Sequence, residues 1–545
     1  MMLGRWQHHL ARLRPMMSLQ KAWWFWLAVL ALPALWPFYR EGLPRSFDGG
    51  LHLLRLSLLD EHMRQGILLP RWTPSLILGY GYPLYNFYAP GAYYLAEGLH
   101  LVGLNLYFAF IGAFVIQMLV AGWGMYLFAW DLFSSRYHPN ETRRAAWAAL
   151  LAAVAYLYGP YLLTNVYIRG AIAEAGAQAL LPWIFWGVRR LLHAPNPARY
   201  FPPVILTLGA LAITHNITLL FLPPVLLLFT LLHWRFCDNR WRRAGWVIGA
   251  FLLAMGVSTF FWLPLLLERH ELADTAYLIA RSVWLPGSAW TWQNFLDAGL
   301  HYTHTFDRPI KLGLVQLILA ALGFVVALGY RKRPEWLGEW LFWLVVTVGV
   351  AAFMGAWALP LWLSNDILPV AQFTWRLLSI LSLPLALFVG GLVLPWPKQW
   401  LRGAIGLVVL VVVILAHRPQ LAWMDVYAAE SATVSQPVFA QIEIDKGVIT
   451  GGHRNSSIQE FRPRWADTDL VLADDLAVPP APVTVRVTAA NNFDLAMTAV
   501  APAATFLRFA TFYFPGWEVR IDGAAQPVYP STNFGLLTVD LPAGT

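Results

Sequence analysis

The run AQFTWRLLSILSLPLALFVGGL (residues 371–392) carries one charged side chain, Arg376, at the start of a long apolar stretch. About 20 apolar residues cross the ~30 Å hydrocarbon core of a bilayer as a helix. A cation near the end of such a helix is costly unless it reaches the interface or an anion. Arg376 therefore either extends to the interface or binds an anionic group. We favour the anion because carboxylate-bearing loops are predicted on the same side of the membrane.

The composition extends this interpretation to the whole chain. Hydrophobic residues make up 58% of the 545 residues and charged residues 12%, which is typical of a polytopic α-helical membrane protein and not of a soluble domain. The single cysteine, Cys237, excludes a disulfide within the chain. The net charge of +8 comes from basic residues scattered in short loops, which indicates membrane topology and no nucleic-acid partner.

Eleven apolar runs are long enough to be counted as spans. They lie at about residues 22–38, 104–132, 145–166, 177–193, 201–216, 217–234, 244–267, 312–330, 336–357, 373–395 and 403–417. The first run lacks a small-residue cleavage site, so we expect an uncleaved span.

Every second loop is basic, which predicts that these loops and the N-terminus face the cytoplasm. The basic residues are Arg136, Arg143, Arg144, Arg189, Arg190, Arg199, Arg235, Arg240, Arg242, Arg243, Arg331, Lys332, Arg333, Lys398 and Arg402. The loops at 39–103, 167–176, 268–311 and 358–372 are then outside.

The pattern changes after His417. Short alternating segments such as VTVRVTA (483–489) and LLTVDL (536–541) are typical of strands, and Asp522-Gly523 is a good hairpin turn. We therefore predict a transmembrane domain over 1–417 with catalytic outside loops, and an extracytoplasmic β-sandwich-like domain over 418–545.

The first outside loop begins FDGGLHLLRLSLLDEHMRQG (47–66), a predicted amphipathic helix. Asp48, His52, Arg55 and His62 fall within an arc of about 80° on one helical face. Such a set could bind metal and phosphate or deprotonate a hydroxyl group. The alternative is a surface helix whose polar stripe faces water.

Two later outside segments carry further candidates. In YIRGAIAEAGAQALLP (167–182), Glu174 needs a partner, which is either Arg169 or a ligand from the first loop. In ITHN (213–216), His215 and Asn216 lie at a helix junction. They either clamp a headgroup, or Asn216 caps the next helix.

The order of several motifs resembles that of the bacterial YfhO-type membrane proteins, of the GT-C class of polytopic glycosyltransferases. These motifs are FDGGLHLLRL (47–56), PLYNFYAPGAYYL (83–95), YIRGAIAEAGAQALLPW (167–183), ITHN (213–216), FTWRLL (373–378), FYFPGWEVRIDG (512–523) and VDLPAGT (539–545). The resemblance covers nearly the whole chain.

The resemblance implies a polyprenyl-phosphate sugar donor, catalytic acids at Asp48 and Glu174, and a phosphate-binding cation at Arg376. The same two acids could hold a divalent metal, Mg or Mn. One departure bears on that site. Asp48 is followed by Gly49 and Gly50 and not by a second acid, so this loop has no paired carboxylates.

We therefore expect inverting transfer of a sugar to a glycan, lipid or protein acceptor at the outer face of the cytoplasmic membrane. Asp48 would be the base or a metal ligand, with Glu174 assisting, and Arg376 would stabilise the leaving phosphate. The predicted substrate-binding residues are His52, Arg55, Arg169, His215, Asn216 and Arg376. The alternatives are a lipid or glycan transporter and a non-catalytic glycan-binding or assembly protein. Asp48, Glu174 and Arg376 are expected to converge on one cavity.

Overall fold

The computed structural model describes residues 23–39, 46–74, 76–77, 80–134, 139–297, 310–330, 334–421, 461–466, 483–490, 494–532 and 534–544. The chain divides into two compact units. The first comprises Met1–Leu53, Gly91–Ser258 and Val283–Thr433, and the second comprises Leu54–Pro90, Thr259–Ser282 and Val434–Thr545. The basic N-terminal residues and residues 331–333, on which the predicted orientation partly rests, lie outside the described residues.

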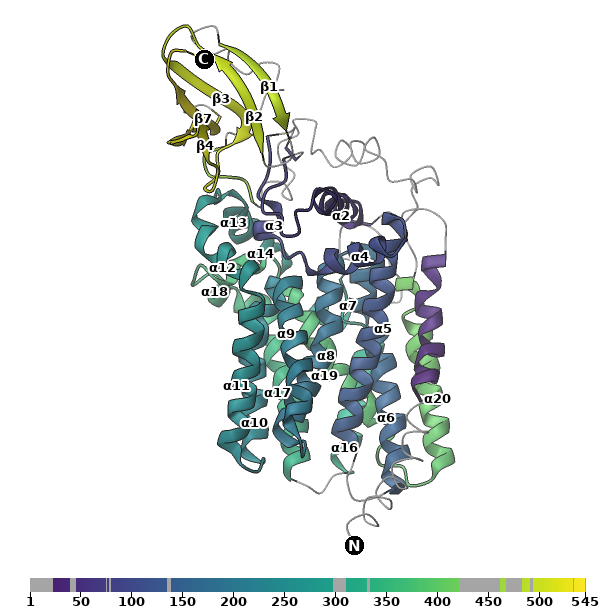
Figure 1. Ribbon diagram of the computed structural model, residues 1–545. Helices are drawn as coiled ribbons and strands as arrows, with labels where there is room; N and C mark the ends of the chain where they lie inside the picture. The colour runs from purple at the N-terminus through teal and green to yellow at the C-terminus, as the bar shows by residue number, and fades with distance from the viewer. Residues whose placement is uncertain are drawn as a thin grey trace. The chain divides into compact units, whose positions relative to one another are not determined.

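The first unit is helical, and its long helices run alongside one another (Figure 1). A helix over Trp23–Tyr39 is followed by α4 (Gly91–Leu101), α5 (Leu106–Phe133), α6 (Pro139–Leu157), α7 (Pro160–Leu163), the π-helical turn η2 (Thr164–Arg169), α8 (Ile172–His193), α9 (Phe201–Thr214), α10 (Asn216–Arg235), α11 (Arg240–Val257), α14 (Leu285–Ser288), α15 (Trp292–Leu296), α16 (Leu314–Leu328), α17 (Pro334–Met354), α18 (Leu359–Trp362), the turn η8 (Thr374–Leu377), α19 (Leu378–Gly391) and α20 (Gln399–Ala416). The helix α2 (Gly49–Arg64) begins in this unit.

The predicted number of eleven spans is not confirmed by the structure. Each of the predicted runs coincides with helix, but within the described residues six helices are long and apolar enough to cross a membrane, or seven if one bent pair is a single span. Two examples give the reason. The helix α9 has only 14 residues, and α8 carries Glu174 in its first turn and Arg190 in its last.

The helices α6 and α19 form the centre of the first unit. In the span Thr142–Arg169, which contains most of α6, 94% of the apolar window is buried. In Thr374–Gly391, which contains α19, 89% is buried. Small residues permit this packing, since a Cβ on Gly390 would lie 2.5 Å from the carbonyl oxygen of Ala148. By contrast, only 28% is buried in the spans of α10, α17 and α20, which are peripheral.

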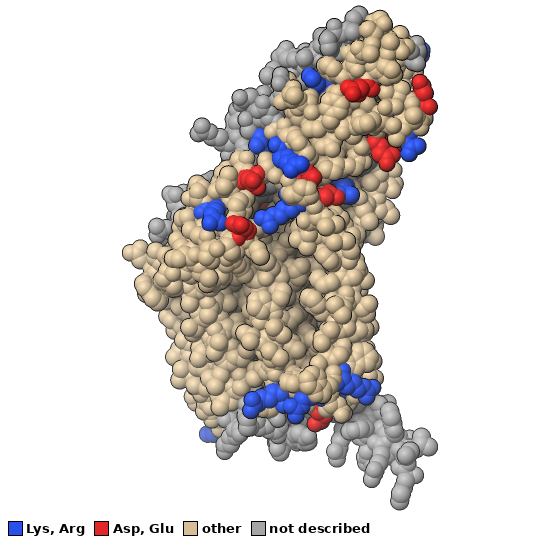
Figure 2. Space-filling model, turned by 90° about the vertical axis from the view of Figure 1, so that its left-hand side faces the viewer, with Lys and Arg blue, Asp and Glu red and all other residues tan. Residues whose placement is uncertain are grey.

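A buried ion network joins three of these helices. Arg189 of α8 donates to Asp131 of α5 over 2.6 Å and to Glu339 of α17 over 3.2 Å, and Arg190 pairs with Asp131 over 2.7 Å. Both arginines lie near the end of α8, and their charge is balanced inside the protein. The predicted orientation therefore rests on other basic residues, such as Arg235 and Arg242. On the face drawn in Figure 2, Lys and Arg gather at one end of a broad band that carries no coloured side chain.

The second unit combines loop segments with the C-terminal strands. It contains most of α2, with α3 (Leu84–Phe87), α12 (Thr259–Glu268) and α13 (Thr275–Ile279). Its strands are β1 (Thr484–Ala490), β2 (Leu495–Val500), β3 (Thr505–Phe512), β4 (Val519–Ile521), β5 (Ala524–Gln526), β6 (Val528–Pro530) and β7 (Leu536–Leu541). They form the antiparallel sheets β1-β2, β3-β7-β6 and β4-β5. Asp522 and Gly523, with φ of 49° and 84°, make the predicted hairpin turn between β4 and β5.

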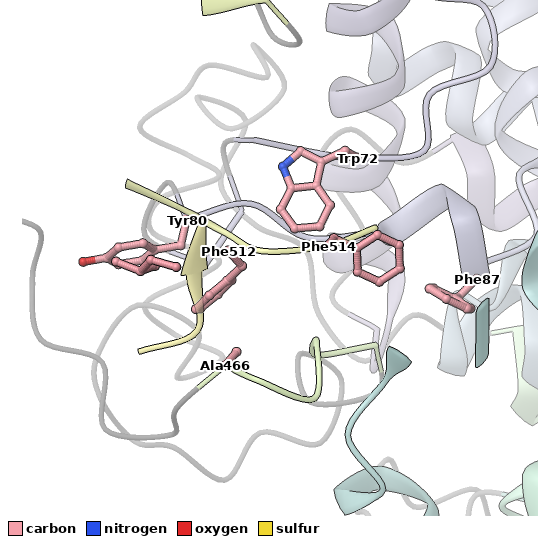
Figure 3. Close-up of a cluster of buried hydrophobic side chains, with 7 residues drawn as sticks. Trp72, Tyr80, Phe87, Ala466, Phe512 and Phe514 are labelled. Atoms are coloured by element: carbon pink, nitrogen blue, oxygen red, sulfur yellow. The ribbon is translucent and has the colours of Figure 1, made fainter. Parts of the chain in front are cut away.

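The core of the second unit is shared between the first loop and the C-terminal strands. Trp72, Tyr80 and Phe87 pack with Phe512 and Phe514, together with Ala466 and Leu536 (Figure 3). The backbone N–H of Phe512 also donates to the carbonyl of Tyr80 over 2.7 Å. These contacts gather residues 54–90 with the C-terminal strands in one compact unit. The domain boundary at 417/418 stays a prediction.

Candidate functional site

The start of α2 is held against the turn that follows η2. The N–H of Phe47 donates to the carbonyl of Ile168 over 3.0 Å, and the N–H of Asp48 donates to that of Arg169 over 2.7 Å. The next residue, Gly170, has φ of 66°, and a Cβ there would lie 2.8 Å from the backbone nitrogen of Gly49. Only glycine fits this left-handed, crowded position. The backbone of Asp48 is thereby fixed beside Arg169.

Gly170→Ala is expected to lower the free energy of unfolding by about 1–3 kcal/mol from left-handed backbone strain, and further through a steric clash. Gly98→Ala is the matched control, since Gly98 lies inside α4 with nothing within 4 Å of its added Cβ. Unfolding of both purified variants in detergent measures the difference. Equal stability of the two variants would contradict the close approach of residues 47–49 to Gly170.

Glu174 is fully engaged by its neighbours. Its Oε2 accepts from Arg169 over 2.6 Å, and its Oε1 accepts from the hydroxyl groups of Tyr161 and, over 3.3 Å, Ser379. The side chain is 2% exposed. Of the two alternatives left by the sequence, the structure has the local Arg169–Glu174 ion pair, which joins the end of η2 to the first turn of α8.

Arg169 also organises the aromatic side of the site. Its Nη1 donates to the side-chain oxygen of Asn165, and its guanidinium lies 4.6 Å from the ring centre of Trp375. Tyr161 packs edge-on against the same Trp375 ring at 6.2 Å. The Arg169 cation is therefore compensated by a carboxylate, an amide and a ring face.

Arg376 lies near the same Trp375 ring and is within electrostatic reach of Glu174, but it shares no hydrogen bond with that carboxylate. Its guanidinium lies 5.3 Å from the ring centre of Phe373 and 5.9 Å from that of Trp375. Its Nε is buried without a hydrogen-bond partner, and no ion pair to it is found in the described part of the chain. A cation in this setting favours an anion.

The backbone just before Arg376 is held by hydrogen bonds and carries one strained residue. Thr374 donates from its N–H to the hydroxyl of Ser288 over 3.1 Å, and from its hydroxyl to the Ser288 carbonyl over 2.8 Å. Just before it, Gln372 has φ of 65°, a strained conformation for a residue other than glycine. Strain of this kind is often retained at binding sites, where it holds a side chain in place.

His215 lies within electrostatic reach of Glu174, Arg169 and Arg376. Its Nδ1 accepts from the N–H of Thr218 over 3.3 Å, so His215 caps α10. The alternative that Asn216 is the cap is therefore wrong, because Asn216 is already the first residue of the helix. A neutral His215 that accepts at Nδ1 carries its proton on Nε2, which makes Nε2 a hydrogen-bond donor.

Asp48 is half-buried at the start of α2, within electrostatic reach of Arg169. Among the residues that the structure describes, its carboxylate has no ion pair. In this respect the Asp48 carboxylate differs from that of Glu174, which accepts three hydrogen bonds. The structure brings Asp48, Arg169, Glu174, His215 and Arg376 together in the first unit, and their roles remain predictions.

The rest of the polar face of α2 does not form a water-facing stripe. His52 is buried and shares a 2.6 Å hydrogen bond with the hydroxyl of Tyr93. Arg55 belongs to the second unit, where its buried guanidinium lies 4.1 Å from the ring centre of Tyr88. His62 is buried between the carbonyls of Leu58 and Trp72. The surface-helix alternative fails because His52, Arg55 and His62 are all buried.

The site fits a divalent metal poorly. No three His, Cys, Asp or Glu side chains are grouped as ligands in the described ranges. Both oxygens of Glu174 already accept hydrogen bonds, and the adjacent Arg169 would repel a second cation. Asp48 alone retains an open carboxylate.

Several contributors to the site were missed by sequence reasoning. These are Tyr161, Asn165, Trp375 and Ser379. Their positions carry no local signal, because each becomes part of the site only through contacts between helices. The adjacency of an aromatic residue and a cation in FTWR was the one usable hint.

Comparisons with known proteins add the following. Residues 85–424 match a family described as "6-pyruvoyl-tetrahydropterin synthase related domain; membrane protein". An uncharacterized protein of Lactococcus lactis subsp. cremoris (strain MG1363) is 22% identical over 274 residues, which are 49% of this chain and 42% of that protein. The chain thus spans less than half the length of this curated relative.

Two solved structures are also similar. The arabinofuranosyltransferase AftD from Mycobacteria matches with a TM-score of 0.41 and 17% identity, over 73% of this chain and 27% of that one. The archaeal oligosaccharyltransferase AglB from Archaeoglobus fulgidus, solved with an inhibitory peptide and a dolichol-phosphate, matches with a TM-score of 0.42 and 11% identity, over 74% of this chain and 55% of that one.

Proposed function

The chain belongs to the family of membrane proteins described as 6-pyruvoyl-tetrahydropterin synthase related domain, and from this premise we propose that it is a membrane glycosyltransferase. Its donor is a polyprenyl-phosphate-linked sugar, and its acceptor is a hydroxyl group of a glycan, lipid or protein. The reaction takes place at the outer face of a bacterial cytoplasmic membrane, where the β-sheet region also lies.

The observation that carries the proposal is the contrast between Arg376 and Arg169. Arg169 forms a 2.6 Å ion pair with Glu174. Arg376 contacts two aromatic rings and forms no ion pair within the described residues, and Glu174 reaches it only electrostatically. A phosphate supplies the charge and the acceptor oxygens that the Arg376 guanidinium lacks. An isoprenoid chain attached to that phosphate fits a site at the end of membrane-spanning helices.

The chemical roles follow from which groups are open. The Asp48 carboxylate takes the proton of the acceptor hydroxyl, and the acceptor oxygen forms a bond to the anomeric carbon with inversion. The bond from that carbon to the phosphate oxygen breaks, and Arg376 stabilises the charge that develops on the leaving phosphate. Glu174 assists by holding Arg169 in place. No step passes through a metal ion.

The remaining predicted residues have supporting roles in this proposal. The Nε2–H of His215 donates to the donor phosphate or sugar, and Asn216 extends that polar end of α10. His52, bound to Tyr93, and Arg55, stacked on Tyr88, orient the donor through the position of α2.

Arg376→Ala is expected to weaken donor binding about tenfold or more and also to slow turnover, because a charged hydrogen bond of about 1.5–3 kcal/mol is lost. Binding of polyprenyl-phosphate sugars and sugar transfer are measured on the purified full-length protein. Arg242→Ala, at an exposed arginine in the first turn of α11, removes the same charge as a control.

The alternatives give different results in the same experiment. A transporter moves the lipid or glycan across vesicles without forming a new glycosidic bond. A non-catalytic binding or assembly protein binds donor or glycan without turnover. Wild-type affinity of Arg376→Ala for all donors tested would reject the phosphate-binding role of Arg376.

A further inference from the structure

Two arginines, Arg144 of α6 and Arg402 of α20, lie near the starts of their helices. Arg144 is at the end of the span Thr142–Arg169 that is opposite Arg169. Arg402 in the first turn of α20 is 6% exposed, and its Nε and Nη1 are buried without a hydrogen-bond partner. Arg144 of α6 is half-buried, its Nε also lacks a partner, and its guanidinium lies 5.1 Å from the ring centre of Tyr330. The two cations are close enough to act on each other electrostatically.

Two other arginines inside the helical unit are paired with carboxylates, unlike Arg144 and Arg402 in the described part of the chain. Arg169 has Glu174, and Arg189 has both Asp131 and Glu339. For Arg144 and Arg402, no carboxylate pairs with either guanidinium within the described residues. Two neighbouring cations, one of them almost fully buried, are costly without an anion between them. A ligand with negative charge would remove that cost.

The surroundings indicate what kind of anion fits. Arg402 lies at the N-terminal end of α20, where the helix dipole and free N–H groups also favour an anion. The same helix exposes Trp400, Leu407, Val408 and Leu415, an apolar surface along which acyl chains can lie. An exposed tryptophan beside basic residues is typical of the headgroup level of a membrane.

We propose that Arg144 and Arg402 bind the phosphate of an anionic phospholipid at the membrane face where α6 and α20 begin. This site is separate from that of Arg376. Arg144 and Arg169 are 25 positions apart in the span Thr142–Arg169, which corresponds to roughly 38 Å along a helix. The lipid would therefore occupy the leaflet opposite the proposed transfer site.

The test uses purified full-length protein in an uncharged detergent and follows thermal unfolding by tryptophan fluorescence. The probes are phosphatidylglycerol, phosphatidylcholine and inorganic phosphate, each titrated separately. Wild type is compared with Arg402→Gln, Arg144→Gln and the control Arg242→Gln, which removes an exposed arginine elsewhere.

We expect phosphatidylglycerol, and not phosphatidylcholine, to raise the unfolding temperature of wild type and of Arg242→Gln. The titration midpoint should rise at least about tenfold in Arg402→Gln and Arg144→Gln. Without lipid, Arg402→Gln should unfold no earlier than wild type, because it loses an unpaired buried cation. A general packing defect would have the opposite sign.

Other outcomes are equally informative. Protection by inorganic phosphate at the same concentrations, lost in both variants, would keep the anion site but overturn the lipid as its occupant. Equal protection of all four proteins by phosphatidylglycerol, or of none, would overturn the site. If Arg402→Gln does not fold, the titration of Arg144→Gln tests the site, since the Arg144 side chain is only half-buried.

Discussion

Asp48→Asn is expected to lower sugar transfer by about 100-fold or more without unfolding the protein, because it removes the general base and little else. Asparagine has nearly the same shape, and the N–H of residue 48 keeps its 2.7 Å bond to the carbonyl of Arg169. Asparagine is also as good as aspartate at the start of a helix such as α2. Transfer from a panel of polyprenyl-phosphate sugars by purified protein is the measurement.

The control for this prediction is Asp238→Asn, at an exposed carboxylate between α10 and α11. It should leave transfer unchanged, and thermal unfolding should be the same for both variants and wild type. Transfer at the wild-type rate by a well-folded Asp48→Asn protein would remove Asp48 from the mechanism. No transfer by wild type from any donor would favour the transporter or the non-catalytic protein.

Arg169→Met is expected to lower the free energy of unfolding by about 3–5 kcal/mol, because it leaves Glu174 buried as an uncompensated charge. Glu174→Gln should be destabilising for the converse reason, since Arg169 is then unpaired. The double variant should cost less than the sum of the single variants, because neither charge remains. Chemical unfolding in detergent gives the four values of this cycle.

An exposed ion pair provides the comparison. Arg520 and Glu518 lie 3.4 Å apart with side chains 64% and 73% exposed, so Arg520→Met should change stability by no more than about 1 kcal/mol. If Arg169→Met were as harmless as Arg520→Met, the 2.6 Å pair to Glu174 would not contribute to the stability of the first unit.

Local patterns in the sequence predicted local structure well. The hairpin at Asp522-Gly523 depends on two residues that accept positive φ, and the strands on either side pair antiparallel. The helix beginning at Gly49 was also predicted. Its burial was not, because amphipathic spacing cannot tell whether the polar face meets water or other side chains.

Contacts between distant segments account for the remaining differences. The Arg169–Glu174 pair was one of two alternatives, since the sequence could not show whether a first-loop ligand came closer. The partners of Arg189 lie on other helices, at Asp131 and Glu339. Likewise, the packing of Trp72 and Phe512 in one core could not be inferred from their composition.

The burial of the span Thr142–Arg169 bears on how the protein tolerates membranes of different thickness. Because 94% of its apolar window is enclosed by protein, hydrophobic mismatch with the acyl chains acts hardly at all on this helix. The mismatch falls instead on the peripheral spans, such as Asn216–Arg235 and Gln399–Ala416, whose windows are 28% buried. These outer helices can tilt to match the bilayer while the axis that carries Arg169 keeps its length and setting.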